Sequence, residues 1–422
     1  MREMKDSGFG YLGEIPDHWR IERIKNHLRF SPDKNPGDAM VLSLYREHGI
    51  VPKDSRDDNH NVTSEDTSNY RYVQVGDFVV NKMKAWQGSM GVSGYEGVVS
   101  PAYYVYRFTT DDFDKKYLHY LLRSKCYADE FRRLSGGIRI GQWDLPKVGF
   151  ETTYVSVPPK GEQIVIAEYI DAQLNKVDTL VVNVQAQIEK LKAYKQSLIT
   201  EVVTKGLDPT VPMKDSGVEW IGEMPTHWKI TRIKNLFDLR NERNDEADLN
   251  KVNLISLYTD LGVVQHSDIV ETTGNRAVTA EGYKFVRKND IVVNIILCWM
   301  GAVGMSQYDG VTSPAYDIYS PKEGTLSEYY HYLFRTNRFN GECYRYGRGI
   351  MMMRWRTYSN EFRAINVPYP PIEEQKKIIE YLKEKCSQID RLIALKEAKI
   401  EKLEQYKKSL IYEYVTGKKE VH

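Results

Sequence analysis

The chain has 422 residues, with 59 Lys and Arg against 58 Asp and Glu, 41% hydrophobic residues and four cysteines. At roughly 100–200 residues per domain this length predicts about two to four domains, each large enough for its own core. A net charge of +1 excludes a uniformly basic coat for nucleic acid but leaves room for a local basic face. The charged start lacks an apolar signal core, no apolar run reaches the ~20 residues that span a bilayer, and no CxxC spacing occurs. We therefore expect a cytoplasmic protein that contacts no membrane and has neither a zinc ribbon nor a disulfide framework.

The chain consists of two copies of one unit. The segment at residues 4–19, which ends in Pro-x-His-Trp, recurs at 213–228, and both copies continue into Arg-Ile-Lys-Asn. Further along, Asp-Phe-Val-Val-Asn at 77–81 recurs as Asp-Ile-Val-Val-Asn at 290–294. Many matches in one order, all offset by about half the chain, indicate tandem duplication, and only two long copies exclude a solenoid.

Each copy begins with a region of mixed character. Residues 1–157 and 207–369 hold short apolar runs broken by glycines and prolines, which is typical of short strands with a few helices. We expect the clearest of these helices at 115–124 and 327–336. The two copies diverge most at 43–70 and 131–156 of the first copy, and at 256–282 and 343–366 of the second.

A long helix is expected at the end of each copy, after the Pro-Pro pairs at 158–159 and 370–371. Apolar residues then step alternately by four and three over about five heptads, with a lysine at the same place in each series, Lys195 and Lys407. Spacing of 3.5 residues marks a seam against another helix. A pseudo-twofold between homologous units would place the two helices antiparallel. The predicted fold class is α+β: two tandem homologous units, each a mixed α/β domain followed by a long helix, with the helices packed as an antiparallel coiled coil.

Catalytic motifs are largely excluded. Residues 8–13 fit GxGxxG, but only seven residues precede them, Pro16 soon follows, and the second copy carries Glu219, so we expect a turn. Asn-Val-Pro-Tyr at 366–369 departs from the Asn-Pro-Pro-Tyr loop of amino-methyltransferases, and neither a P-loop nor an HExxH motif occurs. His119 and His331 occupy equivalent places on expected helices, where a structural role is favoured over metal binding. We expect a non-catalytic chain with no cofactor and no metal.

Basic, amide and aromatic side chains gather where the two copies differ. Arg and Lys bind phosphate, and Arg, Lys, Gln and Asn can read base edges. Two otherwise similar units that differ in such residues fit two readers of different DNA sequences. The candidate DNA-binding residues are Arg46, Lys53, Arg56, Lys82, Lys84, Arg139, Gln142, His266, Asn275, Arg276, Arg345, Arg348, Arg354 and Arg356.

Taken in order, these motifs resemble the specificity subunit of type I restriction–modification enzymes over the whole chain. The motifs that carry the resemblance are Pro-x-His-Trp at 16–19 and 225–228, Gly-Asp-Phe-Val-Val-Asn at 76–81 with its copy at 289–294, and Pro-Pro-x-x-Glu-Gln at 158–163 and 370–375.

The resemblance implies two target-recognition domains, 1–157 and 207–369, each reading one half of a bipartite site in double-stranded DNA. It implies spacer helices at 158–206 and 370–422 that set the half-site spacing and bind two methyltransferase subunits. Those subunits would supply S-adenosylmethionine binding and adenine methylation, and restriction subunits would add ATP-driven translocation and cleavage.

Two other interpretations stay open from the residues alone. A stand-alone DNA-binding regulator would place two readers on a coiled coil, although no helix-turn-helix or zinc finger is evident. A coiled-coil scaffold without DNA binding would join two partners, but it would not explain the arginine and aromatic clusters in the variable segments.

Overall fold

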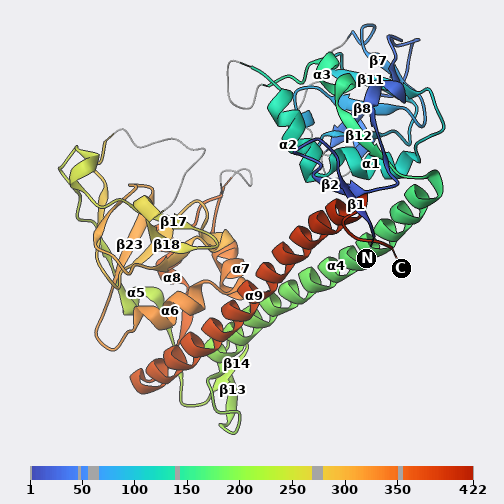
Figure 1. The fold of residues 1–422 in the computed structure, drawn as a ribbon. Coiled ribbons are helices and arrows are strands. Elements are labelled where there is room, and N and C mark those ends of the chain that lie inside the picture. The colour runs from blue at the N-terminus through green and yellow to red at the C-terminus, as the bar shows by residue number, and fades with distance from the viewer. Residues whose placement is uncertain are drawn as a thin grey trace. The chain divides into compact units, whose positions relative to one another are not determined.

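The computed structural model describes residues 2–45, 49–55, 66–137, 143–268, 279–349 and 355–421. The chain forms two compact units. The first unit is Met1–Val184 with Glu397–His422, and the second is Gln185–Lys396. Each unit therefore contains one β-rich domain and a segment of both long helices (Figure 1).

The first domain is built on a four-stranded antiparallel sheet in the order β4–β11–β8–β9. Two-stranded ladders β1–β2, β3–β12, β5–β6 and β10–β7 surround it. The strands are β1 (Met4–Asp6), β2 (Glu14–Pro16), β3 (Arg20–Arg23), β4 (Leu28–Phe30), β5 (Leu42–Tyr45), β6 (Gly49–Pro52), β7 (Arg71–Val73), β8 (Phe78–Asn81), β9 (Met90–Val92), β10 (Gly97–Val99), β11 (Tyr103–Phe108) and β12 (Tyr154–Val157). The helices are α1 (Lys115–Arg123), α2 (Lys125–Leu134) and α3 (Lys147–Thr152), with single turns η1 (Ile24–Asn26), η2 (Lys53–Ser55) and η3 (Ala85–Gln87).

The second domain repeats this topology. Its central sheet has the order β16–β23–β20–β21, and its ladders are β13–β14, β15–β24, β17–β18 and β19–β22. The strands are β13 (Met213–Asp215), β14 (Glu223–Pro225), β15 (Lys229–Arg232), β16 (Phe237–Arg240), β17 (Ile255–Tyr258), β18 (Gly262–Gln265), β19 (Lys284–Val286), β20 (Ile291–Asn294), β21 (Val303–Met305), β22 (Gly310–Thr312), β23 (Tyr316–Pro321) and β24 (Asn366–Tyr369). The helices are α5 (Ile233–Leu236), α6 (Ser327–Phe334), α7 (Asn337–Tyr346) and α8 (Ser359–Ala364), with turns η4 (Leu249–Lys251), η5 (His266–Asp268) and η6 (Cys298–Met300). The expected duplication, and the helices expected at 115–124 and 327–336, are confirmed.

The two long helices are α4 (Lys160–Lys205) and α9 (Ile372–Val415), and they pack against each other (Figure 1). In the first unit Lys407 Nζ donates to Asp178 at 2.8 Å, while Tyr414 and Tyr169 join their hydroxyls at 3.3 Å. In the second unit Lys195 Nζ lies 2.7 Å from both carboxylate oxygens of Asp390. In the first unit, residue numbers fall along one helix as they rise along the other, so the packing is antiparallel. The predicted coiled coil is confirmed, and the predicted lysines of the seam form its ion pairs.

Each domain completes its core with side chains from both helices. The first core includes Ile166 and Ile170 of α4 together with Leu410 and Val415 of α9. The second core includes residues from the opposite end of each helix: Ile199, Val202 and Val203 of α4, and Ile378, Ile379, Leu382 and Cys386 of α9. Tyr117 on α1 also donates its hydroxyl to the carbonyl of Val415 at 2.9 Å. The helices are therefore part of the domain cores.

The shared sequence motifs form the joint between domain and helix. Trp228 is fully buried, and its indole Nε1 donates to Glu374 at 2.8 Å, while His227 pairs with the same carboxylate at 2.6 Å. In the first unit Trp19 donates to Glu162 at 3.1 Å. The His and Trp of Pro-x-His-Trp thus contact the Glu of Pro-Pro-x-x-Glu-Gln. This contact holds the start of each long helix against its domain.

We expect Glu374→Ala to destabilise the second unit by about 1–3 kcal/mol, because it leaves the buried indole N–H of Trp228 without an acceptor. The matched control is Glu373→Ala on the preceding residue, whose side chain is 70% exposed and pairs only with Lys376. That control should change stability by less than about 0.5 kcal/mol. Urea unfolding followed by tryptophan fluorescence measures both, and equal effects would contradict this account of the joint.

Candidate nucleic-acid interface

A short hairpin leaves each domain where the two copies differ most. In the first domain Gly136 and Asp144 bridge their backbones through N–H···O bonds of 3.2 and 2.9 Å. In the second domain Arg348 and Arg356 do the same at 2.9 and 3.0 Å. Residues 138–142 and 350–354, between the bridged residues, lie outside the described residues. The strand topology that the two domains share, which we call the frame, therefore carries the two stems at equivalent places.

Aromatic side chains support each hairpin stem from the turn that follows the central strand. In the first domain Trp143 lies against Trp86 with ring centroids 5.5 Å apart. In the second domain Trp355 stacks on Tyr344 at 4.9 Å, and Tyr344 in turn meets Trp299 at 5.7 Å. The indoles of Trp86 and Trp299 donate to the backbone of their own turns at 3.1 and 3.0 Å, so these platforms are held in place.

The longer variable segment is anchored next to the central sheet. Residues 56–65 and 269–278 lie outside the described residues, but the backbone that follows them is held. In the first domain Asn35 donates to the Thr67 carbonyl and hydroxyl at 3.3 and 2.9 Å. In the second domain Asn244 donates to the Ala280 carbonyl at 3.0 Å.

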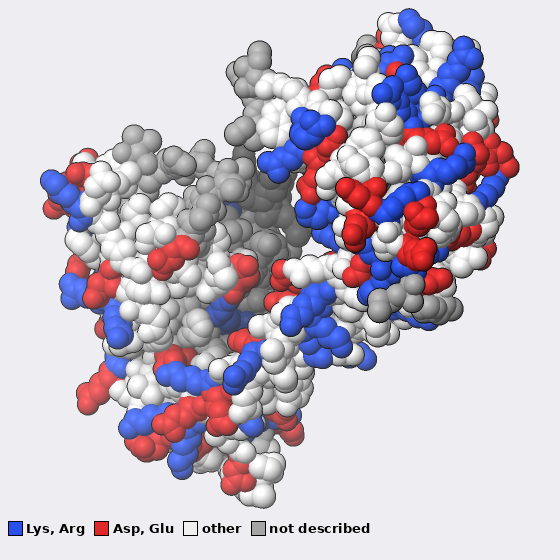
Figure 2. Space-filling view, in the orientation of Figure 1, with Lys and Arg blue, Asp and Glu red and all other residues white. Residues whose placement is uncertain are grey.

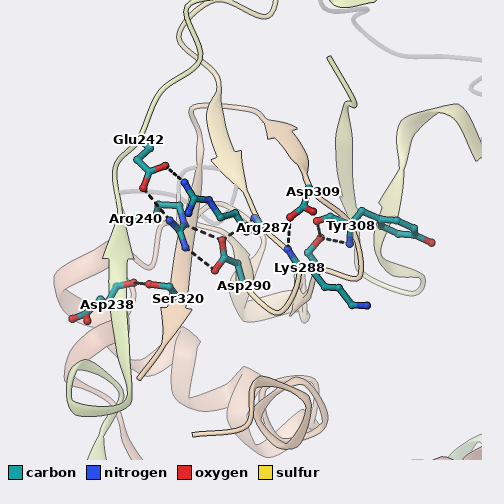
Figure 3. Close-up of polar contacts among 10 residues, drawn as sticks. Asp238, Arg240, Glu242, Arg287, Lys288, Asp290, Tyr308, Asp309 and Ser320 are labelled. Atoms are coloured by element: carbon teal, nitrogen blue, oxygen red, sulfur yellow. Dashed lines mark hydrogen bonds and ion pairs between the residues drawn. The ribbon is translucent and has the colours of Figure 1, made fainter. Parts of the chain in front are cut away.

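A network of charges stiffens this anchor in the second domain (Figure 3). Arg240 forms a two-pronged contact with Asp290, at 3.0 and 3.3 Å, and also donates to Glu242 at 3.0 Å. Arg287 reaches the other oxygen of Glu242 at 2.7 Å. The Asp290 side chain is only 2% exposed, and this burial raises the pKa of its carboxyl, which the hydrogen bond from Arg240 partly offsets.

The first domain places an arginine near the equivalent aspartate from a different strand, and that arginine pairs more closely with Asp33, at 2.7 Å. The strand register makes Asp77 equivalent to Asp290, but here Arg107 on β11 approaches it, with Nε 4.0 Å from the carboxylate. The position of Arg107 is Ser320 in the second domain, and the position of Arg240 is Ser31 in the first. Arginine and serine have exchanged places around one buried carboxylate.

The structure describes seven of the fourteen candidate DNA-binding residues: Lys53, Lys82, Lys84, His266, Arg345, Arg348 and Arg356. The other seven lie outside the described residues: Arg46, Arg56, Arg139, Gln142, Asn275, Arg276 and Arg354. Lys82, Lys84, Arg345, Arg348 and Arg356 stand on or beside the hairpin stems, while Lys53 and His266 open the equivalent turns η2 and η5. The described candidates thus fall at two places in each domain.

Several of these side chains already have carboxylate partners. Lys82 pairs with Asp144 at 3.0 Å, and Arg348 pairs with Glu361 at 2.8 Å. Arg345 contacts Glu342 at 2.6 Å, and this raises the pKa of the guanidinium. Figure 2 shows positive and negative side chains mixed over the visible face of both domains. The Arg345 side chain is 60% exposed despite this pairing.

The other motifs have structural roles. The GxGxxG segment is a turn before strand β2, with positive φ at Gly8 and Gly13 (77° and 63°), as expected. His119 and His331 accept backbone N–H bonds at Nδ1, and burial lowers their pKa to about 3 and about 4, so both are neutral at physiological pH. Among the described residues no group of His, Cys, Asp and Glu could hold a metal ion.

Known proteins share this architecture. Residues 225–405 match the family model described as the type I restriction modification DNA specificity domain. The putative type I restriction enzyme MjaX specificity subunit of Methanocaldococcus jannaschii is 24% identical, over 96% of this chain and 95% of that protein. The MjaVIII specificity subunit of the same organism is also 24% identical, over 96% and 93%.

Two solved structures have the same fold. The HsdS subunit from Thermoanaerobacter tengcongensis gives a TM-score of 0.53 at 14% identity, over 98% of this chain and 99% of that chain. A chain from a structure addressing complex assembly and conformational transition of the type I restriction–modification system gives 0.68 at 12% identity, over 95% and 98%.

Two β-rich domains, each followed by a long helix, are the architecture of the HsdS subunit. The family model and the relatives indicate a DNA specificity subunit, a non-catalytic component of its enzyme. Residues 225–405 match the DNA specificity domain, and over 96% of its length the chain is similar to specificity subunits of type I restriction enzymes. Within the described part of the chain, no helix is long and apolar enough to cross a membrane.

The exchange around the buried aspartate predicts a rescue. Arg240→Ser should destabilise the second unit by about 3 kcal/mol, because it leaves the Asp290 carboxylate buried without its partner. Adding Ser320→Arg recreates the arrangement of the first domain and should recover part of that loss. Ser320→Arg alone serves as the control and should be nearly neutral. Urea unfolding of the three variants measures this, and a double variant no more stable than Arg240→Ser would show that the two arrangements are not interchangeable.

Proposed function

We propose that this chain is the DNA-recognition subunit of a type I restriction–modification complex. Residues 1–157 and 207–369 form two target-recognition domains, and each reads one half of a bipartite site in double-stranded DNA. The observation that carries the proposal is one frame used twice, with the same anchors holding hairpins and loops of different sequence. The two domains have the same frame and the same anchors but different loop sequences. This arrangement suits two domains that recognise half-sites of different sequence.

The proposal gives the helices α4 and α9 two tasks. At 1.5 Å per residue the 46 residues of α4 extend about 69 Å, whereas half-sites one turn of DNA apart are about 34–36 Å from each other. The helices are therefore long enough to set the half-site spacing. Their second task is to bind two methyltransferase subunits, which supply S-adenosylmethionine and methylate adenine, while restriction subunits add cleavage. We place this activity in the cytoplasm.

Two equivalent apolar patches on the helices support the docking of two identical partners. In the first unit Leu180 of α4 and Tyr406 of α9 are 47% and 50% exposed. In the second unit Leu392 and Tyr194 are 48% and 57% exposed. Each of the four residues directly precedes a seam position, so each pair flanks the seam on one side, beside the lysine–aspartate ion pair of its unit. We call these pairs the leucine–tyrosine patches.

Changing Arg354 and Arg356 to Ala should weaken or relax recognition of only the half-site that the second domain reads. A good two-pronged arginine–base contact contributes about 1–3 kcal/mol of discrimination. Methylation-site profiling in cells that express the complex measures the preference for each half separately. Equal changes in both halves would contradict independent domains, and a complex without any site preference would overturn the proposed function.

Leu180→Glu should remove one methyltransferase subunit from the purified complex, and Leu392→Glu the other, because a buried, unpaired carboxylate is costly at an interface. The double variant should bind none. The matched control is Val182→Glu: Val182 is 62% exposed, but it turns about 200° away from Leu180 on the helix, and the second copy has Ala394 there. Native mass spectrometry counts the subunits. Two methyltransferase subunits on the double variant would show that the leucine–tyrosine patches are not the docking surface.

A further inference from the structure

The turn that supports the hairpin stem differs in chemistry between the two domains. In the first domain it carries Lys82, Lys84 and Gln87 around Trp86, and Arg132 of α2 lies over the Trp143 ring at 5.7 Å. Lys84 is exposed, and within the described residues no carboxylate pairs with it. This surface is basic and open to an anion.

The same surface is apolar in the second domain. The strand register places Ile295, Leu297 and Met300 where the first domain has Lys82, Lys84 and Gln87. Leu297 is 37% exposed and Met300 is 51% exposed, and both belong to the turn that carries Trp299.

An aromatic group continues this apolar surface. Tyr344, which replaces Arg132, is 43% exposed and links Trp299 to the stacked ring of Trp355. We call Leu297, Met300, Tyr344 and Trp355 the apolar stem patch.

The chemical difference between the two stem surfaces indicates which partner binds the apolar stem patch. Two identical methyltransferase subunits would require equivalent surfaces, as the leucine–tyrosine patches provide on the helices. The stem surface is basic in one domain and apolar in the other, so its occupants differ in chemistry. Under the proposed function the two half-sites of the DNA are the occupants that differ. Arg345 and Arg348 lie beside the patch with side chains 60% and 70% exposed, which suits a flanking phosphate backbone.

We propose that the second domain recognises its half-site through the 5-methyl groups of thymine, which contact Leu297 and Met300 of the apolar stem patch. The first domain instead contacts phosphate at the equivalent place through Lys84. This inference rests on the proposed function and deepens it. The thymine methyl is the apolar group that the major groove displays, and apolar side chains read it. Adenine methylation in each half guarantees at least one thymine opposite.

Uracil substitution tests the proposal directly, because it removes only the methyl group. The site is first identified by methylation profiling, and the half altered by changing Arg354 and Arg356 is assigned to the second domain. The complex with methyltransferase is then titrated with duplexes in which the thymines of one half-site are replaced by deoxyuridine. Substitution in the second half should weaken binding about fourfold per contacted methyl, and substitution in the first half less than about twofold. Equal loss in both halves, or no loss in the second, would overturn the inference.

Matched variants exchange the chemistry of the two domains. Leu297→Lys installs the residue of the first domain, so it should reduce uracil sensitivity and steepen the plot of log affinity against log salt by about 0.9, as one added phosphate contact requires. Lys84→Leu should make that slope shallower by a similar amount. Met300→Gln, which copies Gln87, should reduce uracil sensitivity without changing the slope.

The outcomes separate the inference from the proposed function. A wild-type complex without sequence-specific binding would overturn both. Specific binding that is insensitive to uracil overturns only the inference. A Leu297→Lys complex that keeps its uracil sensitivity but loses a methyltransferase subunit would show that the apolar stem patch docks protein.

Discussion

Neither β-rich domain closes its core with its own residues alone. Leu410 and Val415 from the end of the second helix are buried in the first domain, and Ile199 and Val203 from the end of the first helix are buried in the second. Burying a Leu, Ile or Val side chain contributes about 1.5–3 kcal/mol, so these contacts contribute strongly to the stability of each unit. The coiled coil and the domains therefore form and melt together, and the orientation of each helix follows from the domain that holds it.

The same joint occurs in both units, and it separates what is constant from what varies. Glu162 and Glu374 each hold a buried tryptophan, and Gln163 and Gln375 are fully buried beside them. The hairpin stems attach to the turns after β8 and β20 through backbone bonds, from Leu145 to Lys82 and from Thr357 to Ile295, which do not depend on side-chain identity. Loop sequences can therefore change without disturbing the helices. The exchange of Arg107 for Arg240 around one buried carboxylate shows that even charged contacts can move within the frame.

The sequence was sufficient for the features that depend on periodicity and repetition. The 4,3 spacing predicted the seam, and the lysines that interrupt it, Lys195 and Lys407, form its ion pairs. The strand order was not predictable, because three- and four-residue strands carry almost no periodic pattern. The contact of Trp228 with Glu374 was missed as well, although both copies of the unit carry the two motifs. The exposure of Leu180 and Tyr406 was also missed, because each directly precedes an apolar or lysine position of the seam and the sequence does not distinguish the two.

The candidate DNA-binding residues stay a prediction, and for a physical reason. Contact with DNA depends on the direction of exposed side chains, whereas sequence patterns report burial. Half of the candidates lie outside the described residues, and among the rest Lys82 and Arg348 are paired with carboxylates. The contrast between Lys84 and Leu297 emerged only once the strand register aligned the two turns.

The sharing of helix ends between cores also has a consequence for the order of folding during synthesis. The second core needs nothing beyond Cys386, so it can close while the last residues of α9 are still being made. The first core requires Leu410, Tyr414 and Val415, which are translated more than four hundred residues after the first strand. The domain that leaves the ribosome first is thus the last to finish. Until then its open apolar face is exposed to association with other nascent chains, which makes the first domain the vulnerable part of this protein in the cell.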